Sequence, residues 1–293
     1  CFSASKSVSI MQFVIKDPAI LEAHRFACRK AMAFVEDEAL TQANTQQDRF
    51  YHRTGNIMMM AFDHFTTRGI EMEVGNQKQY VPDCQLHSHC IVPNFTFNPK
   101  KNRFQALEIG KTHEQAPFVE EVYHAHLSRE LVKAGYAIRR TKDRYEIEGV
   151  SKDIIDRFSN RTAQIEKIAK EQQITNPVEK AKIGASSRVS KSKVDTNLDL
   201  DKIWKDRLSE RELKDLQSLK NRKVKKEKPI TAREAIDRSI AHYLERNSTA
   251  KEKTVLAHAL KLGYGQLLPE DVSNELNNRT NILKSDIDMI THI

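Results

Sequence analysis

One seven-residue run, Leu86-His87-Ser88-His89-Cys90-Ile91-Val92, restricts the possible fold more than any other part of the chain. Its apolar and β-branched side chains are typical of a strand in a buried sheet. In a strand, residues i and i+2 point to the same face. His87 and His89 are therefore expected side by side, on a sheet that the fold must contain.

A third histidine, His64, ends another apolar strand that begins at Ile57. A histidine pair alone is weak evidence for a metal, because paired histidines are also common in cores and on surfaces. An adjacent antiparallel strand would bring His64 next to the pair. Three protein ligands with open positions are typical of a working metal site, so we predict a divalent-metal site at His64, His87 and His89.

A second His-x-His pair, His124 and His126, lies in a segment expected to be helical. Residues i and i+2 of a helix are separated by about 200° around the axis, so these two rings cannot share an ion. We interpret both as structural.

The first half of the chain alternates expected strands with expected helices, which predicts an α+β fold with an antiparallel, palm-like sheet and flanking helices. The pair Gly55-Asn56 favours a hairpin turn between two of the strands, and residues 69–83 read as an inserted loop or hairpin. The expected strands cover 2–13, 49–54, 57–66, 86–97, 104–109, 136–140 and 144–148, and the expected helices cover 17–40 and 115–134.

Beyond Ser151 the sequence favours helices, and we expect no further strand. A Lys- and Ser-rich stretch at 176–197 reads as a linker, and a charged helix is expected over 200–220. The pattern predicts a first domain over 1–175, a basic linker and helix over 176–230, and an α-helical segment over 231–293.

Charge and cysteine usage limit the possible partners and compartment. Residues 111–230 contain 28 basic and 20 acidic side chains, so the whole formal excess of +8 lies there. Such localised positive charge favours a polyanion partner. The four cysteines form no C-x-x-C pair, and neither a signal peptide nor a membrane-spanning run is visible. These features predict a cytoplasmic protein with reduced thiols.

Several motifs together resemble conjugative relaxases of the TrwC/TraI (MobF) type, which are HUH endonucleases. They occur in the family's order and extend over nearly the whole chain. The motifs are Phe2-Ser-Ala-Ser-Lys-Ser-Val-Ser9, Phe62-Asp-His-Phe-Thr-Thr-Arg68, Gln85-Leu-His-Ser-His-Cys-Ile-Val-Pro-Asn94 and Gln105-Ala-Leu-Glu108, followed by weaker matches to the start of a helicase region at Ile240–Arg246 and Ala259–Gly263.

The resemblance implies that His64, His87 and His89 hold Mg²⁺ or Mn²⁺ against a scissile phosphate, although imidazoles also suit Zn²⁺, Ni²⁺ or Co²⁺. It implies nicking and rejoining of single-stranded plasmid DNA at a transfer origin, through a phosphotyrosine intermediate and with other relaxosome proteins. Lys6 and Arg68 match positions near the bound strand and are candidate phosphate contacts. Asn94 is a candidate for orienting a metal ligand.

The catalytic tyrosines of the family are expected before Cys1, so none of the seven tyrosines here is assigned as nucleophile. The fragment alone is then expected to be inactive, and two alternatives stay open. One is a module that binds metal and single-stranded DNA without cutting it. The other is an unrelated cupin-like metalloenzyme, which also uses a His-x-His pair and a distant histidine.

Overall fold

The computed structural model describes residues 1–44, 49–74, 77–187, 190, 197–223, 228–285 and 289–292. Its strands are β1 (Phe2–Ser3), β2 (Leu40–Asn44), β3 (Arg49–Arg53), β4 (Met60–Thr66), β5 (Ile70–Val74), β6 (Gln77–Val81), β7 (Cys84–Ile91), β8 (Thr96–Asn98), β9 (Arg103–Gln105), β10 (Ile138–Arg140), β11 (Tyr145–Ile147), β12 (Ala250–Lys251), β13 (Ile282–Lys284) and β14 (Met289–His292).

The helices alternate with these strands in the first half of the chain and dominate the second. They are α1 (Lys6–Ile10), the π-helix η1 (Met11–Ile15), α2 (Pro18–Asp37), α3 (Ile109–Glu114), α4 (Ala116–Lys133), α5 (Lys152–Arg157), α6 (Asn160–Glu171), α7 (Pro177–Ser186), α8 (Leu200–Lys205), α9 (Glu210–Gln217), α10 (Ala232–Leu244), α11 (Glu252–Leu262) and α12 (Pro269–Asn277).

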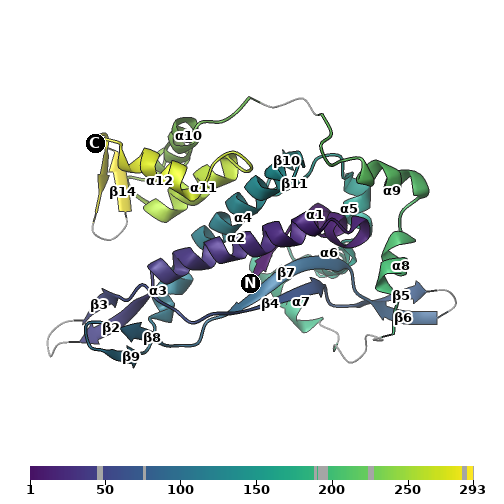
Figure 1. Cartoon of the computed structure of the whole chain (residues 1–293), viewed down its shortest axis with the longest axis horizontal. Helices are drawn as coiled ribbons and strands as arrows, with labels where there is room; N and C mark the ends of the chain where they lie inside the picture. Colours follow the sequence, from purple (N-terminus) through teal and green to yellow (C-terminus); the bar gives the residue numbers. More distant parts are fainter. Residues whose placement is uncertain are drawn as a thin grey trace.

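The central sheet consists of β1, β7 and β4 in that order, all antiparallel. Helices α2 and α4 pack against each other and cross the molecule above β4 and β7 (Figure 1). The hairpins β2–β3 and β8–β9 extend from one end of the β4–β7 ladder, and the hairpin β5–β6 extends from the other. The fold is therefore α+β with antiparallel sheets and flanking helices, as the sequence predicts.

Helix α2 begins where its local sequence requires. The Asp17 side chain accepts a hydrogen bond from the Ala19 amide at 3.0 Å, and Pro18 occupies the first helical position. Both features stabilise a helix N-terminus. The buried residues of α2 recur at helical spacing, and they pack against α4 and the central sheet.

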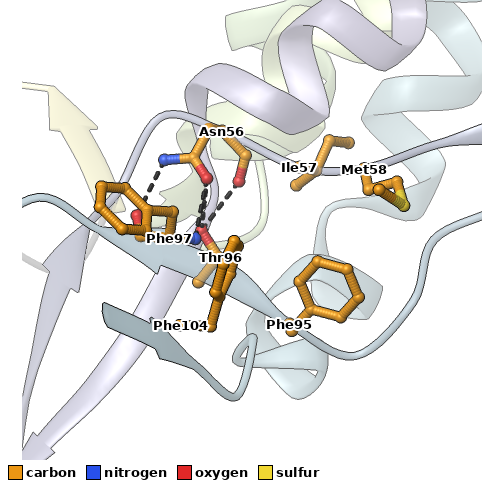
Figure 2. Close-up of a pocket in the computed structure, with 7 residues that line it drawn as sticks. All are labelled: Asn56, Ile57, Met58, Phe95, Thr96, Phe97 and Phe104. Carbon is orange, nitrogen blue, oxygen red and sulfur yellow. Dashed lines mark hydrogen bonds between the residues drawn. The ribbon is translucent and has the colours of Figure 1, made fainter. Parts of the chain in front are cut away.

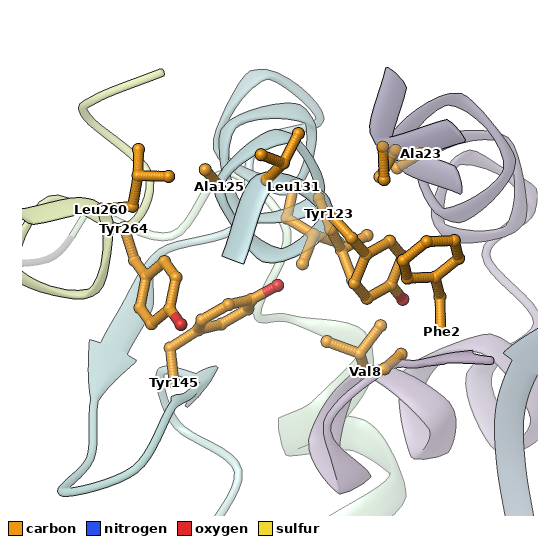
Figure 3. Packing of buried hydrophobic residues seen from close by; sticks show 14 of the residues in the cluster. Phe2, Val8, Ala23, Tyr123, Ala125, Leu131, Tyr145, Leu260 and Tyr264 are labelled. Atoms are coloured by element: carbon orange, nitrogen blue, oxygen red, sulfur yellow. The ribbon is translucent and has the colours of Figure 1, made fainter. Parts of the chain in front are cut away.

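The core is continuous from the sheet to the C-terminal helices. Phe2 stacks on Tyr123 of α4, with ring centroids 5.1 Å apart, and Val8 lies beside them (Figure 3). The buried Tyr145 of β11 contacts Tyr264, which follows α11. Among the described residues, no helix has both the length and the apolar character needed to cross a lipid bilayer.

Several local predictions were wrong. The strand expected over 2–13 ends at Ser3, and α1 and η1 follow it. Gly55 does have a positive φ of 64°, but β3 pairs with β2 rather than with β4. The helix expected over 200–220 is divided into α8 and α9, because Ser209 caps a new helix.

Later in the chain, the expected linker contains α7, which Asn176 caps through the Val178 amide. The expectation of no strand after Ser151 was also wrong, because β12, β14 and β13 form a small antiparallel sheet. These strands are two to four residues long, too short for their alternation to be distinguished from helical spacing.

Candidate metal centre

The three histidines singled out in the sequence meet on one face of the central sheet. In the β4–β7 ladder, His64 is directly opposite His87, and Phe62 is opposite His89. The register shifts just beyond His64, between that residue and Thr66. Bulges of this kind re-aim side chains and are frequent beside functional sites. Backbone pairing alone therefore places all three rings together.

The three imidazole rings lie close to one another. The ring centroids are 5.3 Å apart for His64–His87, 4.8 Å for His64–His89 and 5.3 Å for His87–His89. A ligating nitrogen lies about 2.1 Å from its ion and a ring centroid about 1 Å farther, so rings at roughly right angles would have centroids about 4.5–5 Å apart. The His64–His89 separation falls within this range, and the other two exceed it by a few tenths of an ångström.

The ring orientations are not yet those of a ligated site. The planes of His64 and His87 are nearly parallel, at 24°, so the two rings stack instead of pointing at one shared position. In the part of the chain that the structure describes, no three His, Cys, Asp or Glu side chains meet metal-site geometry as they stand. The strand register keeps the three histidines on one face, and imidazole rotation changes ring orientation without moving the backbone.

One hydrogen bond defines the protonation of His87. Its Nδ1 lies 3.0 Å from the carbonyl oxygen of Gln85, and a carbonyl can only accept. His87 therefore carries its proton on Nδ1, and in the neutral ring the lone pair is on Nε2. Carbonyl partners of this kind fix the tautomer and orientation of metal-ligating histidines.

The opposite face of the same two strands carries a buried chain of polar groups. The Ser88 hydroxyl donates to the Asp63 carboxylate at 2.6 Å, so it accepts from Nε2 of His24 at 2.7 Å. The Tyr123 hydroxyl then donates to Nδ1 of His24 at 2.7 Å. Asp63 also accepts from Arg25 at 2.8 Å. These bonds connect helices α2 and α4 to the residues adjacent in sequence to the three histidines.

The sequence analysis did not single out His24, although a signal was available. Strand alternation places Asp63 and Ser88 on the face opposite the histidines. His24 lies on the apolar stripe of α2, between Ile20 and Cys28 at four-residue spacing. A histidine on a core-facing stripe needs a buried partner, and Ser88 and Asp63 were the polar residues pointing toward that core.

Burial of His24 makes the stability of the fold depend on pH. Burial lowers the pKa of His24 to about 4, against the attraction of Asp63. Below its ordinary pKa of 6.5 the unfolded chain gains a proton there that the folded chain does not, so stability falls as the pH drops from about 6.5 to 4. The expected loss is up to about 3 kcal/mol. Urea unfolding across this range should show a shallower pH dependence in His24→Asn, whereas the exposed His113→Gln should match the parent; equal slopes in all three would contradict the assignment.

The other predicted site residues lie in different environments. Arg68 is half-buried and follows β4, close in sequence to His64. The Lys6 ammonium donates to the Cys84 carbonyl at 2.8 Å, and burial lowers the pKa of Lys6. Asn94 is exposed and lies three residues beyond the end of β7. The structure therefore groups the three histidines, whereas Lys6 is bonded to the backbone at the start of β7.

Four of the tyrosines have surroundings unsuited to nucleophilic attack. Tyr123 and Tyr145 are completely buried, and burial raises the pKa of each well above its ordinary value. Tyr136 donates to Asp17 at 2.6 Å, and Tyr264 donates to Glu121. Burial, followed by the neighbouring carboxylates, raises the pKa of these two as well.

Comparison with known proteins assigns the family. The chain is 34% identical over 123 residues to the multifunctional conjugation protein TraI of Escherichia coli K12; this covers 42% of the chain but only 6% of TraI. Two solved structures of the conjugative relaxase TrwC, each 28% identical with a TM-score of 0.62, cover 73% of this chain. One of them is a metal-bound structure in complex with OriT DNA, and 70% of that chain is covered. The other is a complex with a 27-mer DNA that comprises the recognition hairpin and the cleavage site, and 72% of that chain is covered. The model of the TrwC relaxase family matches residues 1–211. The chain therefore belongs to the TrwC relaxase family.

Proposed function

We propose that this chain is the metal-binding and DNA-binding part of a relaxase that nicks and rejoins single-stranded plasmid DNA at a transfer origin. One observation carries the proposal: in a chain of this family, the backbone register brings His64, His87 and His89 together on one face of the central sheet, with the His64 and His89 rings 4.8 Å apart. The metal and OriT DNA in the TrwC structures support it. Family membership removes the ground for an unrelated cupin-like enzyme.

The three imidazoles would hold one divalent cation, which supplies a Lewis acid for the phosphoryl oxygens. Neutral nitrogen ligands leave the charge of that ion undiminished. The Gln85 carbonyl would keep the His87 ring oriented, and the chain from Ser88 to His24 would hold the strand beneath it. From the family we propose Mg²⁺ or Mn²⁺ as the ion. The three nitrogen donors by themselves favour Zn²⁺, Ni²⁺ or Co²⁺, which are the alternatives.

For DNA contacts we propose Arg68 first, because it follows the strand that carries His64. Lys6 remains a candidate, but its ammonium would have to exchange the Cys84 carbonyl for a phosphate oxygen. We expect Lys6→Ala to have the smaller effect. Asn94, which follows β7, is a proposed orienting residue for a metal ligand.

Binding of single-stranded oligonucleotides should weaken steeply with salt. With roughly four to six phosphate contacts, affinity is expected to fall about 50- to 300-fold between about 50 and 200 mM salt, because bound counterions are released. Arg68→Ala should reduce the slope of log affinity against log salt concentration by about 0.7. Lys251→Ala, in the C-terminal part of the chain, should leave this slope unchanged. Fluorescence anisotropy over a salt series measures both, and a flat salt response of the parent chain would rule out the proposed phosphate contacts.

A denaturing gel with a labelled origin oligonucleotide separates the enzyme from the binding module. A stable adduct formed with Mn²⁺ would show that this chain itself supplies a nucleophile. Binding without an adduct would favour the module. We further propose that residues 231–293 form the start of a helicase-type region, and that the protein acts with other relaxosome proteins in the cytoplasm. The division into 1–175, 176–230 and 231–293 likewise remains a proposal.

A further inference from the structure

The ladder of β4 and β7 is anchored at both of its ends. At the Met60 end, Asn56 joins the segment before β4 to β8. Its side-chain amide donates to the Phe97 carbonyl at 2.9 Å, and its side-chain oxygen accepts from the Phe97 amide at 2.9 Å (Figure 2). At the opposite end, beside His64, the anchor is Trp204 of α8. A residue from the stretch expected as a linker and helix thus reaches the end of the ladder that carries a proposed metal ligand.

An aromatic chain connects Trp204 with the residue next to His64. The ring centroids of Trp204 and Phe13, in the π-helix η1, are 6.0 Å apart, and those of Phe13 and Phe65 are 5.2 Å apart. Phe65 follows His64 in β4, where the register shifts between His64 and Thr66. Short π-helices are rare and are found frequently at functional sites. Displacement of Phe65 would turn the backbone of His64, because the two residues share one planar peptide unit.

Hydrogen bonds connect the same segment with the strand ends beyond the register shift. The Trp204 indole N–H donates to the Pro82 carbonyl at 3.0 Å. Arg207 donates to the Asp83 carboxylate at 2.6 Å. The Asp83 carbonyl accepts from the Thr67 amide at 2.9 Å, and the Asp83 amide donates to the Thr67 hydroxyl at 3.0 Å. Pro82 and Asp83 directly precede β7, and Thr67 directly follows β4. Trp204 and Arg207 therefore hold both strands just past His64.

Burial makes this connection stiff. Trp204 is 4% exposed, and the side chains of Arg207 and Asp83 are 11% and 2% exposed. Close-packed interiors have low compressibility and transmit strain. Phe65, in contrast, is 40% exposed and lies at the end of the aromatic chain. A displacement of α8 would therefore be passed on to the end of β4 and not absorbed on the way.

We propose that Trp204 is a positioning residue for His64, which makes α8 part of the metal centre; the proposal rests on the proposed function. Bulges and register shifts re-aim the side chains beside them. The rings of His64 and His87 are only 24° from parallel, so His64 has to turn before both can point at one ion. Trp204 would fix the backbone from which the His64 ring turns. His89 pairs with Phe62 in the regular part of the ladder and depends less on this anchor.

The test is calorimetric titration with Zn²⁺, because nitrogen ligands bind Zn²⁺ more tightly than Mn²⁺ and weakened variants stay measurable. Trp204→Leu should lower the affinity about 10- to 100-fold, the usual effect of losing a residue that orients a metal ligand. Trp204→Phe should recover part of this loss, because it keeps a ring against Phe13. The double variant His64→Ala, Trp204→Leu should bind no more weakly than His64→Ala alone, because a residue that acts through His64 has no further effect once His64 is absent.

Control variants separate positioning from a general loss of stability. Leu260→Ala removes a side chain of α11 that is 0% exposed, so it lowers stability and should leave Zn²⁺ affinity unchanged. Phe65→Ala serves if Trp204→Leu does not fold, because it interrupts the same aromatic chain at a half-buried position. It should lower the affinity as Trp204→Leu does. Phe50→Ala in β3 is its matched control, since Phe50 is 39% exposed and lies outside this chain.

The outcomes distinguish this proposal from the metal centre itself. A parent chain that binds no Zn²⁺, or a His64→Ala variant that binds it like the parent, would contradict the proposed function. If His64→Ala loses affinity but the Trp204 and Phe65 variants bind like their controls, only the positioning role is overturned. Additive losses in the double variant would also overturn it, because Trp204 would then act independently of His64.

Discussion

Replacing His87 or His89 by alanine is expected to lower Mn²⁺ affinity at least about 100-fold, because loss of an outer partner already costs about 10- to 100-fold and these residues would be direct ligands. His64→Ala should have a comparable effect, since the His64 ring lies 4.8 Å from that of His89. Calorimetric titration of the folded variants measures the affinities. These side chains are exposed or half-buried, so the variants should fold.

The matched control is His124→Ala, which belongs to the other His-x-His pair. His124 is only 3% exposed on α4, beside Tyr145 and Tyr264, and should not affect metal affinity. Its circular dichroism must be checked, because removing a buried side chain lowers stability. Unchanged Mn²⁺ binding in a His87→Ala, His89→Ala double variant would eliminate the proposed metal centre.

Asp83→Ala is expected to destabilise the fold by about 3–5 kcal/mol, because it leaves a buried cation without its counter-charge. The Asp83 carboxylate is 2% exposed and pairs with Arg207 at 2.6 Å, whose side chain is 11% exposed. It also accepts from the backbone and side-chain amides of Asn160, both at 2.9 Å. Urea unfolding at neutral pH measures the loss.

An exposed ion pair provides the comparison for this variant. Asp156 pairs with Lys152 on helix α5, where the two side chains are 57% and 82% exposed. Asp156→Ala should change stability by less than about 1 kcal/mol, because such pairs are solvated and screened. If Asp83→Ala and Asp156→Ala unfold at the same urea concentration, the buried pair does not hold the fold together.

The central features of the site could be predicted from sequence because they depend on local periodicity. Alternation along β7 placed His87 and His89 on one face, and an apolar strand ending at His64 indicated an adjacent partner. The structure gives that pairing. The helix starting at Pro18 followed from its cap, and within the expected insertion at 69–83 the strands β5 (Ile70–Val74) and β6 (Gln77–Val81) pair. The roles of the predicted site residues remain to be measured.

Features that depend on long-range contacts could not be predicted in this way. Trp204 donates to the Pro82 carbonyl at 3.0 Å, and Arg207 pairs with Asp83, although more than 120 residues separate the partners. The composition of 176–230 indicated a basic linker, and nothing local shows that two of its residues complete a buried cluster around β7. The pairing of β2 with β3 could not be predicted either, because the turn signal at Gly55-Asn56 indicated a hairpin between residues 49–54 and 57–66.

The double role of β7 has an evolutionary consequence. Its Leu86 and Ser88 face the core, whereas His87 and His89 face the open side of the sheet. Under the proposed function, selection for folding and selection for metal affinity would act on interleaved positions of a single strand. A substitution at Ser88 would be exposed to both pressures although it touches no ion. Divergence in this family should be slowest on this strand and its helix partner at His24, and faster in the β5–β6 hairpin.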